Sequence, residues 1–303
     1  MLRAGCAMLL VVVLASGQPL QEQVITVNVD LVNIYFTVSN KRGRLVTNLD
    51  RGSFRALEDG KVQTITHFSK ETDAPLTILL LVDTSGSVRD KLKFEQEAAV
   101  DFLAATLRRG RDKAAVFTFD HAIEMRQDFT DDPLLLATSI KSIMAGGGTR
   151  MYDALYSVII NNLSGPDDRK VVILITDGDD KSSRRTPDDV VQAAIRNDVS
   201  IYSISVNALG FFRTGTEQAD GMLDRLALET GGMSFFPKKV EKLAGDFKKI
   251  GDELRSQYTL AYRSTNPKRD GLFRRIDIEA NKGYSVRARP GYFAPVQVAA
   301  GTK

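Results

Sequence analysis

Three short segments of the sequence carry oxygen-bearing side chains in an order that could bind a metal ion. Asp83, Ser85 and Ser87 form a D-x-S-x-S segment, which offers one carboxylate and two hydroxyls. Thr149 follows three consecutive glycines, and Asp177 lies in a Thr-Asp-Gly segment. A set of oxygen ligands suits Mg²⁺ or Mn²⁺ better than zinc or copper. We therefore predict a divalent-metal site formed by Asp83, Ser85, Ser87, Thr149 and Asp177.

Each segment also has another interpretation. The D-x-S-x-S segment could be only a capped helix start, because Asp and Ser are favoured at that position. Asp83 and Asp177 could be the paired acids of an aspartic-type hydrolase, which share one proton. The chain could also be a structural subunit in which a bound metal only stiffens the crevice that contains these residues. The three glycines before Thr149 could suggest a phosphate loop, but no Gly-Lys-Ser/Thr follows them.

Other catalytic machinery is sparse in the sequence. The only histidines are His67 and His121, and neither H-E-x-x-H nor G-x-S-x-G occurs. Zinc proteolysis and esterase chemistry therefore lack their usual parts, and we predict a binding protein and not an enzyme. We expect His67 on the surface or in the packing of a strand, and for His121 a role in a turn is favoured over a place at the binding rim.

The oxygen-bearing segments follow apolar runs that are typical of buried strands. Residues 76–82 and 171–175 are continuously apolar, as in central parallel strands covered on both faces. Strands that alternate with amphipathic helices predict an α/β fold with a doubly wound, mostly parallel sheet and helices on both faces. The functional crevice of such a sheet lies at the carboxyl ends of its strands. Further strands are expected at 114–119 and 200–206, and helices at about 90–108, 131–144, 149–162, 186–196 and 221–230.

Both flanks of this region have the pattern of short strands. In residues 23–68 the apolar face changes near Leu31, as at a bulge or where a strand moves between packed sheets. Asp59-Gly60 predicts a hairpin turn. Neither flank can bury much core alone, so we expect the two to pack together, or against the α/β domain, in a small β-sandwich-like unit. In the later flank, strands are expected at 258–263, 272–280 and 284–289.

The order of these segments resembles the metal-ion-dependent adhesion site of von Willebrand factor type A domains. The resemblance covers roughly residues 75–258 and rests on D-x-S-x-S, the threonine after a glycine loop, and T-D-G. The flanks resemble the VWFA-related domain family of exported bacterial proteins, through F-R-A-L-E-D-G-K at 54–61 and R-A-R-P-G-Y-F-A-P at 287–295. All five positions of the adhesion site are present.

The resemblance implies a role for each residue of the site. Ser85, Ser87 and Thr149 would ligate the metal, whereas Asp83 and Asp177 would act largely through water or change role with the state of the site. A cation held mainly by hydroxyls keeps uncompensated charge and an open position. A carboxylate from a protein partner can fill that position.

Composition and the N-terminus indicate an exported protein. The chain has 303 residues, 43% of them hydrophobic and 26% charged, with a formal net charge of +3, so no nucleic-acid footprint is evident. Residues 1–17 read as a signal peptide, with Arg3 before an apolar core, which predicts a periplasmic or extracellular mature chain without a transmembrane segment. Cys6, the single cysteine, would be removed with it.

The basic pairs at 108–109, 184–185 and 274–275 are expected on solvated faces. The predicted boundaries are 1–17 signal peptide, 18–73 β segment, 74–256 α/β domain, 257–296 β segment and 297–303 tail.

Overall fold

The computed structural model describes residues 31–70, 74–165, 169–180, 182–207 and 217–296. The chain divides into two units, Met1–Asp30 and Leu31–Lys303, and the first lies wholly outside the described residues. The predicted signal peptide, Cys6, the strand before Leu31 and the tail therefore concern parts of the chain that the structure does not describe.

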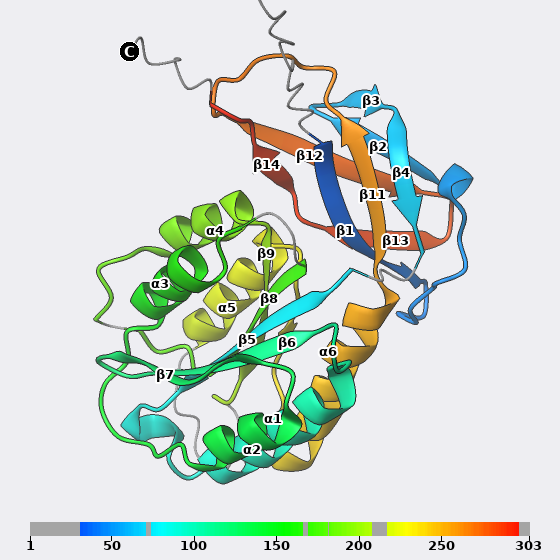
Figure 1. The fold of residues 1–303 in the computed structure, drawn as a ribbon. Coiled ribbons are helices and arrows are strands. Elements are labelled where there is room, and N and C mark those ends of the chain that lie inside the picture. The colour runs from blue at the N-terminus through cyan, green and yellow to red at the C-terminus, as the bar shows by residue number, and fades with distance from the viewer. Residues whose placement is uncertain (1–30, 71–73, 166–168, 181, 208–216, 297–303) are drawn as a thin grey trace, which may run out of the picture. The chain divides into compact units, whose positions relative to one another are not determined.

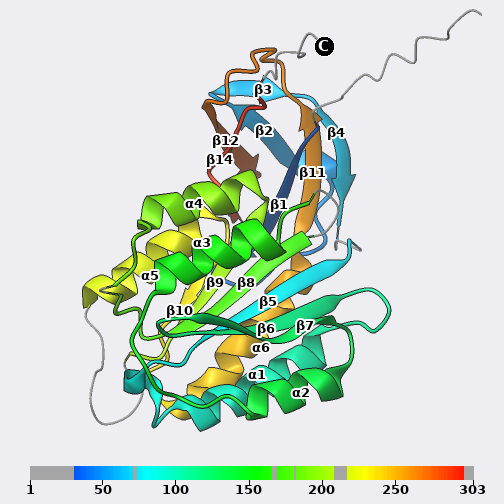
Figure 2. The same ribbon diagram turned by 60° about the vertical axis from the view of Figure 1, so that its left-hand side comes forward.

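A six-stranded sheet with the order β10-β9-β8-β5-β6-β7 forms the centre of the α/β domain (Figures 1 and 2). Five of its strands are parallel, and β7 is an antiparallel edge strand. Every residue of β5 and β8 is buried, because helices cover both faces of the sheet. The predicted doubly wound, mostly parallel sheet is confirmed. The strands are β5 (Leu76–Asp83), β6 (Lys113–Phe119), β7 (Ile123–Thr130), β8 (Arg169–Thr176), β9 (Val199–Ser205) and β10 (Ser234–Phe235).

Helices cover both faces of this sheet (Figure 2). One apolar core joins α1, α2 and α6 to one face, and a second core joins α3, α4 and α5 to the other. Helix α4 starts where predicted: Thr186 is its N-cap, Pro187 is its first residue, and Thr186 and Asp189 form a capping box across the first turn. The helices are α1 (Leu92–Thr106), α2 (Pro133–Lys141), α3 (Met151–Asn162), α4 (Pro187–Arg196), α5 (Glu217–Glu229) and α6 (Leu243–Ser256), with short 3₁₀ turns η1 (Arg51–Ser53), η2 (Gly86–Val88) and η3 (Val240–Lys242).

The sequence prediction omitted β7 and α6. Most side chains of β7 are exposed, so the strand lacks the apolar alternation that reveals a half-buried strand. Helix α6 contains two glycines, which lower its intrinsic helix propensity. A Cβ at Gly251 would lie 2.9 Å from the Thr106 hydroxyl, so this glycine lets α6 pack closely on α1. Tertiary packing therefore outweighs propensity in α6.

The two β flanks form two four-stranded sheets with a shared core (Figure 1). Each sheet contains strands from both flanks, because β1 pairs with β11 and β13, and β2 pairs with β12. The predicted β-sandwich-like unit is therefore confirmed, with the α/β domain inserted in it; the boundary residues stay a prediction. The strands are β1 (Leu31–Asn40), β2 (Phe54–Glu58), β3 (Lys61–Gln63), β4 (Ile65–Ser69), β11 (Tyr258–Arg263), β12 (Phe273–Ala280), β13 (Tyr284–Ala288) and β14 (Gly291–Phe293).

Two sequence features of the sandwich have clear structural roles. Asp59 and Gly60 have φ values of 47° and 78° and form the predicted turn between β2 and β3. Glu58 is buried and accepts hydrogen bonds from Tyr262, Tyr292 and Ser264. The segment at 54–61 thus combines a turn with a buried acceptor that joins both sheets.

One basic side chain departs from its predicted exposure. Arg274 is buried and forms an ion pair with Asp270 at 2.8 Å, so its prediction as part of a solvated face was wrong. His67, in β4, is exposed as expected. Among the described residues, no helix is long and apolar enough to cross a membrane.

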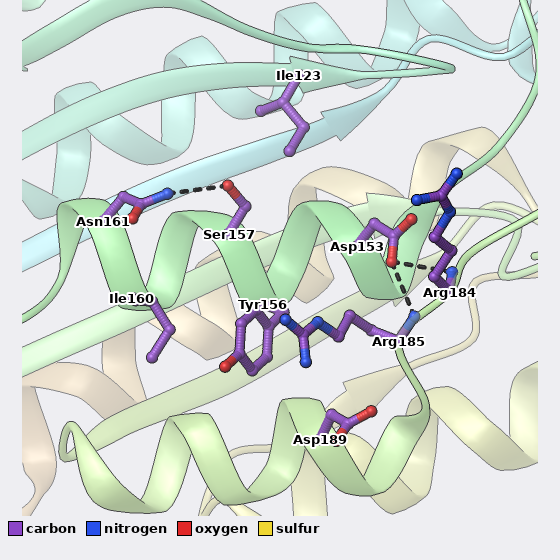
Figure 3. A pocket seen from close by; sticks show the side chains of 9 residues that line it. All are labelled: Ile123, Asp153, Tyr156, Ser157, Ile160, Asn161, Arg184, Arg185 and Asp189. Carbon is purple, nitrogen blue, oxygen red and sulfur yellow. Dashed lines mark hydrogen bonds between the residues drawn. The ribbon is translucent and has the colours of Figure 1, made fainter.

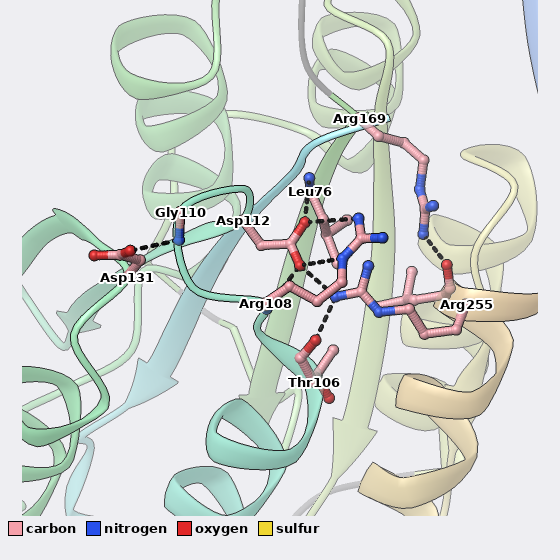
Figure 4. Close-up of polar contacts among 9 residues, drawn as sticks. Leu76, Thr106, Arg108, Gly110, Asp112, Asp131, Arg169 and Arg255 are labelled. Atoms are coloured by element: carbon pink, nitrogen blue, oxygen red, sulfur yellow. Dashed lines mark hydrogen bonds and ion pairs between the residues drawn. The ribbon is translucent and has the colours of Figure 1, made fainter. Parts of the chain in front are cut away.

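Asp112 ties together the elements at the amino end of the sheet (Figure 4). It accepts hydrogen bonds from Leu76 N at 3.0 Å, Arg108 Nε at 3.0 Å and Arg255 at 2.6 Å, and so links β5, the end of α1 and α6. Burial raises the pKa of Asp112, but the hydrogen bonds from Arg108 and Leu76 outweigh it and hold this pKa well below its usual range. Asp112 therefore joins elements at the amino end of the sheet, whereas the polar side chains of the candidate site lie at the opposite, carboxyl end.

Candidate metal centre

Asp83 and Asp177 lie side by side at the carboxyl edge of the sheet. Asp83 is the last residue of β5, and Asp177 directly follows β8, which pairs with β5 in parallel register. Both carboxylates are fully buried. Thr176 Oγ1 donates a hydrogen bond of 2.6 Å to Asp83 Oδ2, which connects the two strand ends. The positions that the sequence pattern assigned to these acids therefore agree with the sheet.

The two serines lie immediately beside Asp83. Ser85 N donates to Asp83 Oδ1 at 2.8 Å, and the hydroxyls of Ser85 and Ser87 are 3.0 Å apart. Ser85 precedes η2 but makes no capping hydrogen bond with its side chain. The interpretation of this segment as only a capped helix start is therefore not supported.

The loop that carries Thr149 is bonded to the loop that carries the serines. Gly86 N donates to Gly147 O at 3.2 Å, and Gly146 N donates to Thr84 O at 2.6 Å. On its other side, Arg150 N donates to Asp120 O at 3.0 Å. Thr149 is thus held between the end of β5 and the turn after β6, at the same edge of the sheet as Asp83 and Asp177.

Two glycines allow this close approach. Gly147 has a φ of +115°, and a Cβ there would lie 2.4 Å from an oxygen of Asp120. A Cβ at Gly148 would lie 2.2 Å from the His121 ring. Asp120 Oδ1 in turn accepts a hydrogen bond from Ala122 N at 2.8 Å, so the segment with His121 forms a turn against the glycine loop. This placement agrees with the turn role expected for His121.

Substitution of Gly147 by alanine tests the support for Thr149. The positive φ and the contact with Asp120 should lower the free energy of unfolding by about 1–3 kcal/mol. Gly146→Ala is the matched control, because no atom lies within 4 Å of its added Cβ, and it should change stability by less than about 0.5 kcal/mol. Urea unfolding measures both variants. Equal stability of the two variants would contradict this account of the loop.

The polar atoms at this edge fit a divalent cation. Asp177 Oδ2 is buried and has no hydrogen-bond partner among the described residues, an arrangement that leaves a charge uncompensated. The Ser85 and Ser87 hydroxyls are spaced like neighbouring ligands of an octahedron with bonds of about 2.1 Å, whose oxygens are roughly 3.0 Å apart. Within the described chain, no cluster of three or more His, Cys, Asp or Glu side chains could hold a metal by itself.

Two further charged side chains lie beneath this edge, and the sequence prediction missed both. Glu95 on α1 is 1% exposed, and neither of its oxygens has a partner among the described residues. Lys91, at the start of α1, donates from Nζ to Val206 O at 2.6 Å. Glu95 lies one turn from Leu92 and Ala99 on the buried stripe of α1, so a charge at an otherwise apolar position was the available signal.

Burial raises the pKa values of two carboxyl groups here, those of Asp83 and Glu95. Burial raises the pKa of Asp83 to about 6, against the opposing hydrogen bonds from Thr176 and Ser85. Burial, followed by the negative charge of Asp83, raises the pKa of Glu95 to about 8. Burial thus disfavours the charged forms of Asp83 and Glu95, and a cation held beside them would offset this cost.

Asp180 has a structural role that the sequence interpretation did not assign. Its Oδ2 accepts a hydrogen bond from Tyr152 N at 3.0 Å, and its Oδ1 accepts from the backbone of Ser182 and Ser183. It therefore satisfies a free backbone group at the start of α3. Asp180 itself lies in the loop after β8 and is half-buried.

A family model matches the part of the chain that forms the α/β domain. The model described as von Willebrand factor type A domain matches residues 77–250. No curated protein matches the chain significantly.

Solved structures with similar folds share little sequence with the chain. Proximal thread matrix protein 1 from the mussel byssus aligns with a TM-score of 0.53 and 17% identity, over 65% of this chain and 51% of that one, so the chain spans about half its length. A von Willebrand factor type A protein from Catenulispora acidiphila aligns with a TM-score of 0.51 and 15% identity, over 87% and 74%. Another structure of the mussel protein, with a zinc-occupied MIDAS motif, has a TM-score of 0.49 and 19% identity, over 61% and 49%. At such identities, these likenesses concern the fold alone.

Proposed function

Because the chain belongs to the von Willebrand factor type A domain family, we propose that it binds a protein partner through a divalent cation at the carboxyl edge of its sheet. Ser85, Ser87 and Thr149 would hold Mg²⁺ or Mn²⁺ directly. Asp83 and Asp177 would compensate its charge and orient the hydroxyls or bound water. We refer to these five residues as the adhesion site.

The buried, unpaired Asp177 Oδ2 is the observation that carries this proposal. A carboxylate oxygen without a hydrogen-bond donor is costly in a protein interior unless a cation compensates it. The neighbouring Asp83 has both oxygens engaged, by Ser85 N and Thr176 Oγ1. Asp83 is therefore suited to position the hydroxyl ligands, whereas Asp177 retains an oxygen for the cation or its water.

The partner should present a carboxylate beside an apolar contact. An open position on a hard cation favours an oxygen anion. Met144 is 84% exposed and lies two residues before Gly146, whose backbone is bonded to Thr84 at the site. An exposed methionine provides an adaptable apolar contact for a protein surface. These features favour a protein ligand over a small inorganic anion.

The aspartic-hydrolase alternative gains no support from the geometry. Asp83 Oδ2 accepts its hydrogen bond from Thr176, and no hydrogen bond joins the carboxyl groups of Asp83 and Asp177 among the described residues. A catalytic dyad requires two carboxyl groups that share a proton. We therefore propose a binding module without an enzymatic activity.

We also propose that the chain is exported from the cytoplasm. The basic residue and the apolar run at the N-terminus, which lie outside the described residues, favour passage across a membrane and removal of residues 1–17. The site would then operate in the periplasm or outside the cell, where free divalent cations are available to it.

Affinity capture with and without chelator tests the proposed function. The immobilised wild-type protein should retain a partner from its native source in Mg²⁺ and release it in EDTA. Ser85→Ala, which removes a hydroxyl ligand but leaves the Ser85 N to Asp83 hydrogen bond, should retain little of it. Retention of the same partner in EDTA would show that the metal serves only stability or no purpose in binding.

A further inference from the structure

A second candidate binding surface lies along α3, whose first residue follows Thr149 by two positions (Figure 3). It is an open pocket of about 600 Å³ that residues of α3 share with Ile123 of β7 and with the segment that leads into α4. We call it the α3 pocket. Its charged lining residues are Asp153, Arg184, Arg185 and Asp189.

The two arginines of the α3 pocket are available to a ligand. Both are exposed, and neither forms an ion pair within 4.0 Å in the part of the chain that the structure describes. The Arg185 side chain lies against the Tyr156 ring (Figure 3), and its guanidinium carbon is 3.9 Å from the ring centroid. Stacking holds this group in one plane and leaves its N–H groups free to donate sideways, which suits a carboxylate.

The two acids of the pocket are directed at backbone groups and not at these guanidinium groups. Asp153 Oδ1 accepts from the backbone nitrogens of Arg184 and Arg185 at 3.0 and 2.9 Å. Asp189 Oδ2 accepts from the backbone and hydroxyl of Thr186 at 2.8 and 2.9 Å. Each acid lies in the first turn of a helix, where the helix dipole favours negative charge. The positive charges therefore face the solvent.

Apolar and amide groups complete the pocket. Ile123 and Ile160 are 38% and 39% exposed on opposite sides of it. Asn161 donates to the Ser157 hydroxyl at 3.1 Å and keeps its amide oxygen free for a backbone N–H. Such a surface suits a peptide with one acidic and one apolar side chain.

We propose that the α3 pocket binds a second acidic side chain of the same partner segment whose first carboxylate completes the metal at the adhesion site. This inference rests on the proposed function. Helix α3 begins two residues after Thr149, and Tyr156 lies seven residues beyond that threonine. At about 1.5 Å per helical residue, this spans roughly 10 Å, which about three residues of extended peptide cover. The partner motif is therefore two acids separated by a short spacer with an apolar residue.

Fluorescence anisotropy with defined peptides tests this inference. The probe is a labelled peptide with two aspartates separated by a short spacer that contains phenylalanine, and its analogue has asparagine in place of the second aspartate. In Mg²⁺, Arg184→Gln/Arg185→Gln should bind the two-acid peptide about tenfold more weakly than wild type, because charge-assisted hydrogen bonds are lost. The variant should bind the one-acid peptide as well as wild type does.

The matched control is Arg42→Gln/Arg44→Gln, which removes the same charge from an exposed turn of the β-sandwich and should change affinity less than about twofold. Equal binding of the two-acid peptide by wild type and Arg184→Gln/Arg185→Gln would overturn the inference, as would no saturable binding up to about 1 mM peptide. Calorimetric titration with Mg²⁺ judges the adhesion site separately. If Ser85→Ala lost Mg²⁺ binding but Arg184→Gln/Arg185→Gln bound the two-acid peptide like wild type, the proposed function would stand and the role of the α3 pocket would be rejected.

Discussion

Replacement of Asp177 by asparagine should lower the affinity for Mg²⁺ by at least about 100-fold and, at the same time, stabilise the metal-free protein. The two effects have opposite signs because the carboxylate stabilises the protein only when a cation is bound to it. Without metal, Asp177 is a buried carboxylate whose Oδ2 has no partner in the described part of the chain. Burial is the main cause of the raised pKa values of Asp83 and Glu95, and the charge of Asp177 raises both further. Asparagine keeps the shape and removes the charge.

Two measurements separate these effects. Calorimetric titration gives the Mg²⁺ affinity, and urea unfolding in EDTA gives the stability of the metal-free protein. Asp101→Asn, at an exposed position of α1, is the control for loss of one negative charge and should leave both quantities nearly unchanged. An Asp177→Asn variant that binds Mg²⁺ like wild type would exclude this carboxylate from the metal centre.

The second large effect is expected from Glu95, through the pH dependence of stability. Its folded pKa of about 8 lies above the 4.5 of an unperturbed glutamate, because burial disfavours its charged form. The folded protein therefore binds more protons than the unfolded chain between these pH values, and its free energy of unfolding falls as pH rises from about 4.5 to about 8. The loss from Glu95 alone should be on the order of 4 kcal/mol.

Glutamine at position 95 should remove most of this slope. Urea unfolding in EDTA at several pH values should show wild type losing stability toward pH 8 and Glu95→Gln staying nearly level, with a smaller decline from Asp83 below about pH 6. Mg²⁺ should restore wild type most strongly at pH 8. Glu97→Gln, exposed on the same helix, should keep the wild-type slope. A level profile for wild type in EDTA would contradict the burial of an ionisable Glu95.

The fold and the acids at the strand ends were predictable because their signals are local. Continuous apolar runs identify β5 and β8 as covered strands, and the residues that follow such strands must lie at one edge of a parallel sheet. Asp83 and Asp177 are placed by this rule alone. The hairpin at Asp59-Gly60 is equally local, because its backbone needs two residues that tolerate positive φ.

What the sequence did not reveal depends on contacts between distant segments. The pKa of Glu95 is raised by burial and by the charge of Asp83, and not by its neighbours in the chain. Arg274 is buried because Asp270 pairs with it across a turn, although Arg274-Arg275 has the pattern of a solvated pair. Helix α6 is stabilised by its packing on α1, where Gly251 lies close to Thr106. Local pattern cannot show which segments meet in such contacts.

The most direct test of the adhesion site is the location of a bound metal. A crystal of the protein grown with Mn²⁺ and measured at the manganese absorption edge should show one anomalous peak at the carboxyl edge of the sheet, next to the hydroxyls of Ser85, Ser87 and Thr149. The same crystal of Asp177→Asn should show no peak there. A strong wild-type peak at another location, or none at this edge at saturating Mn²⁺, would contradict the proposed metal centre.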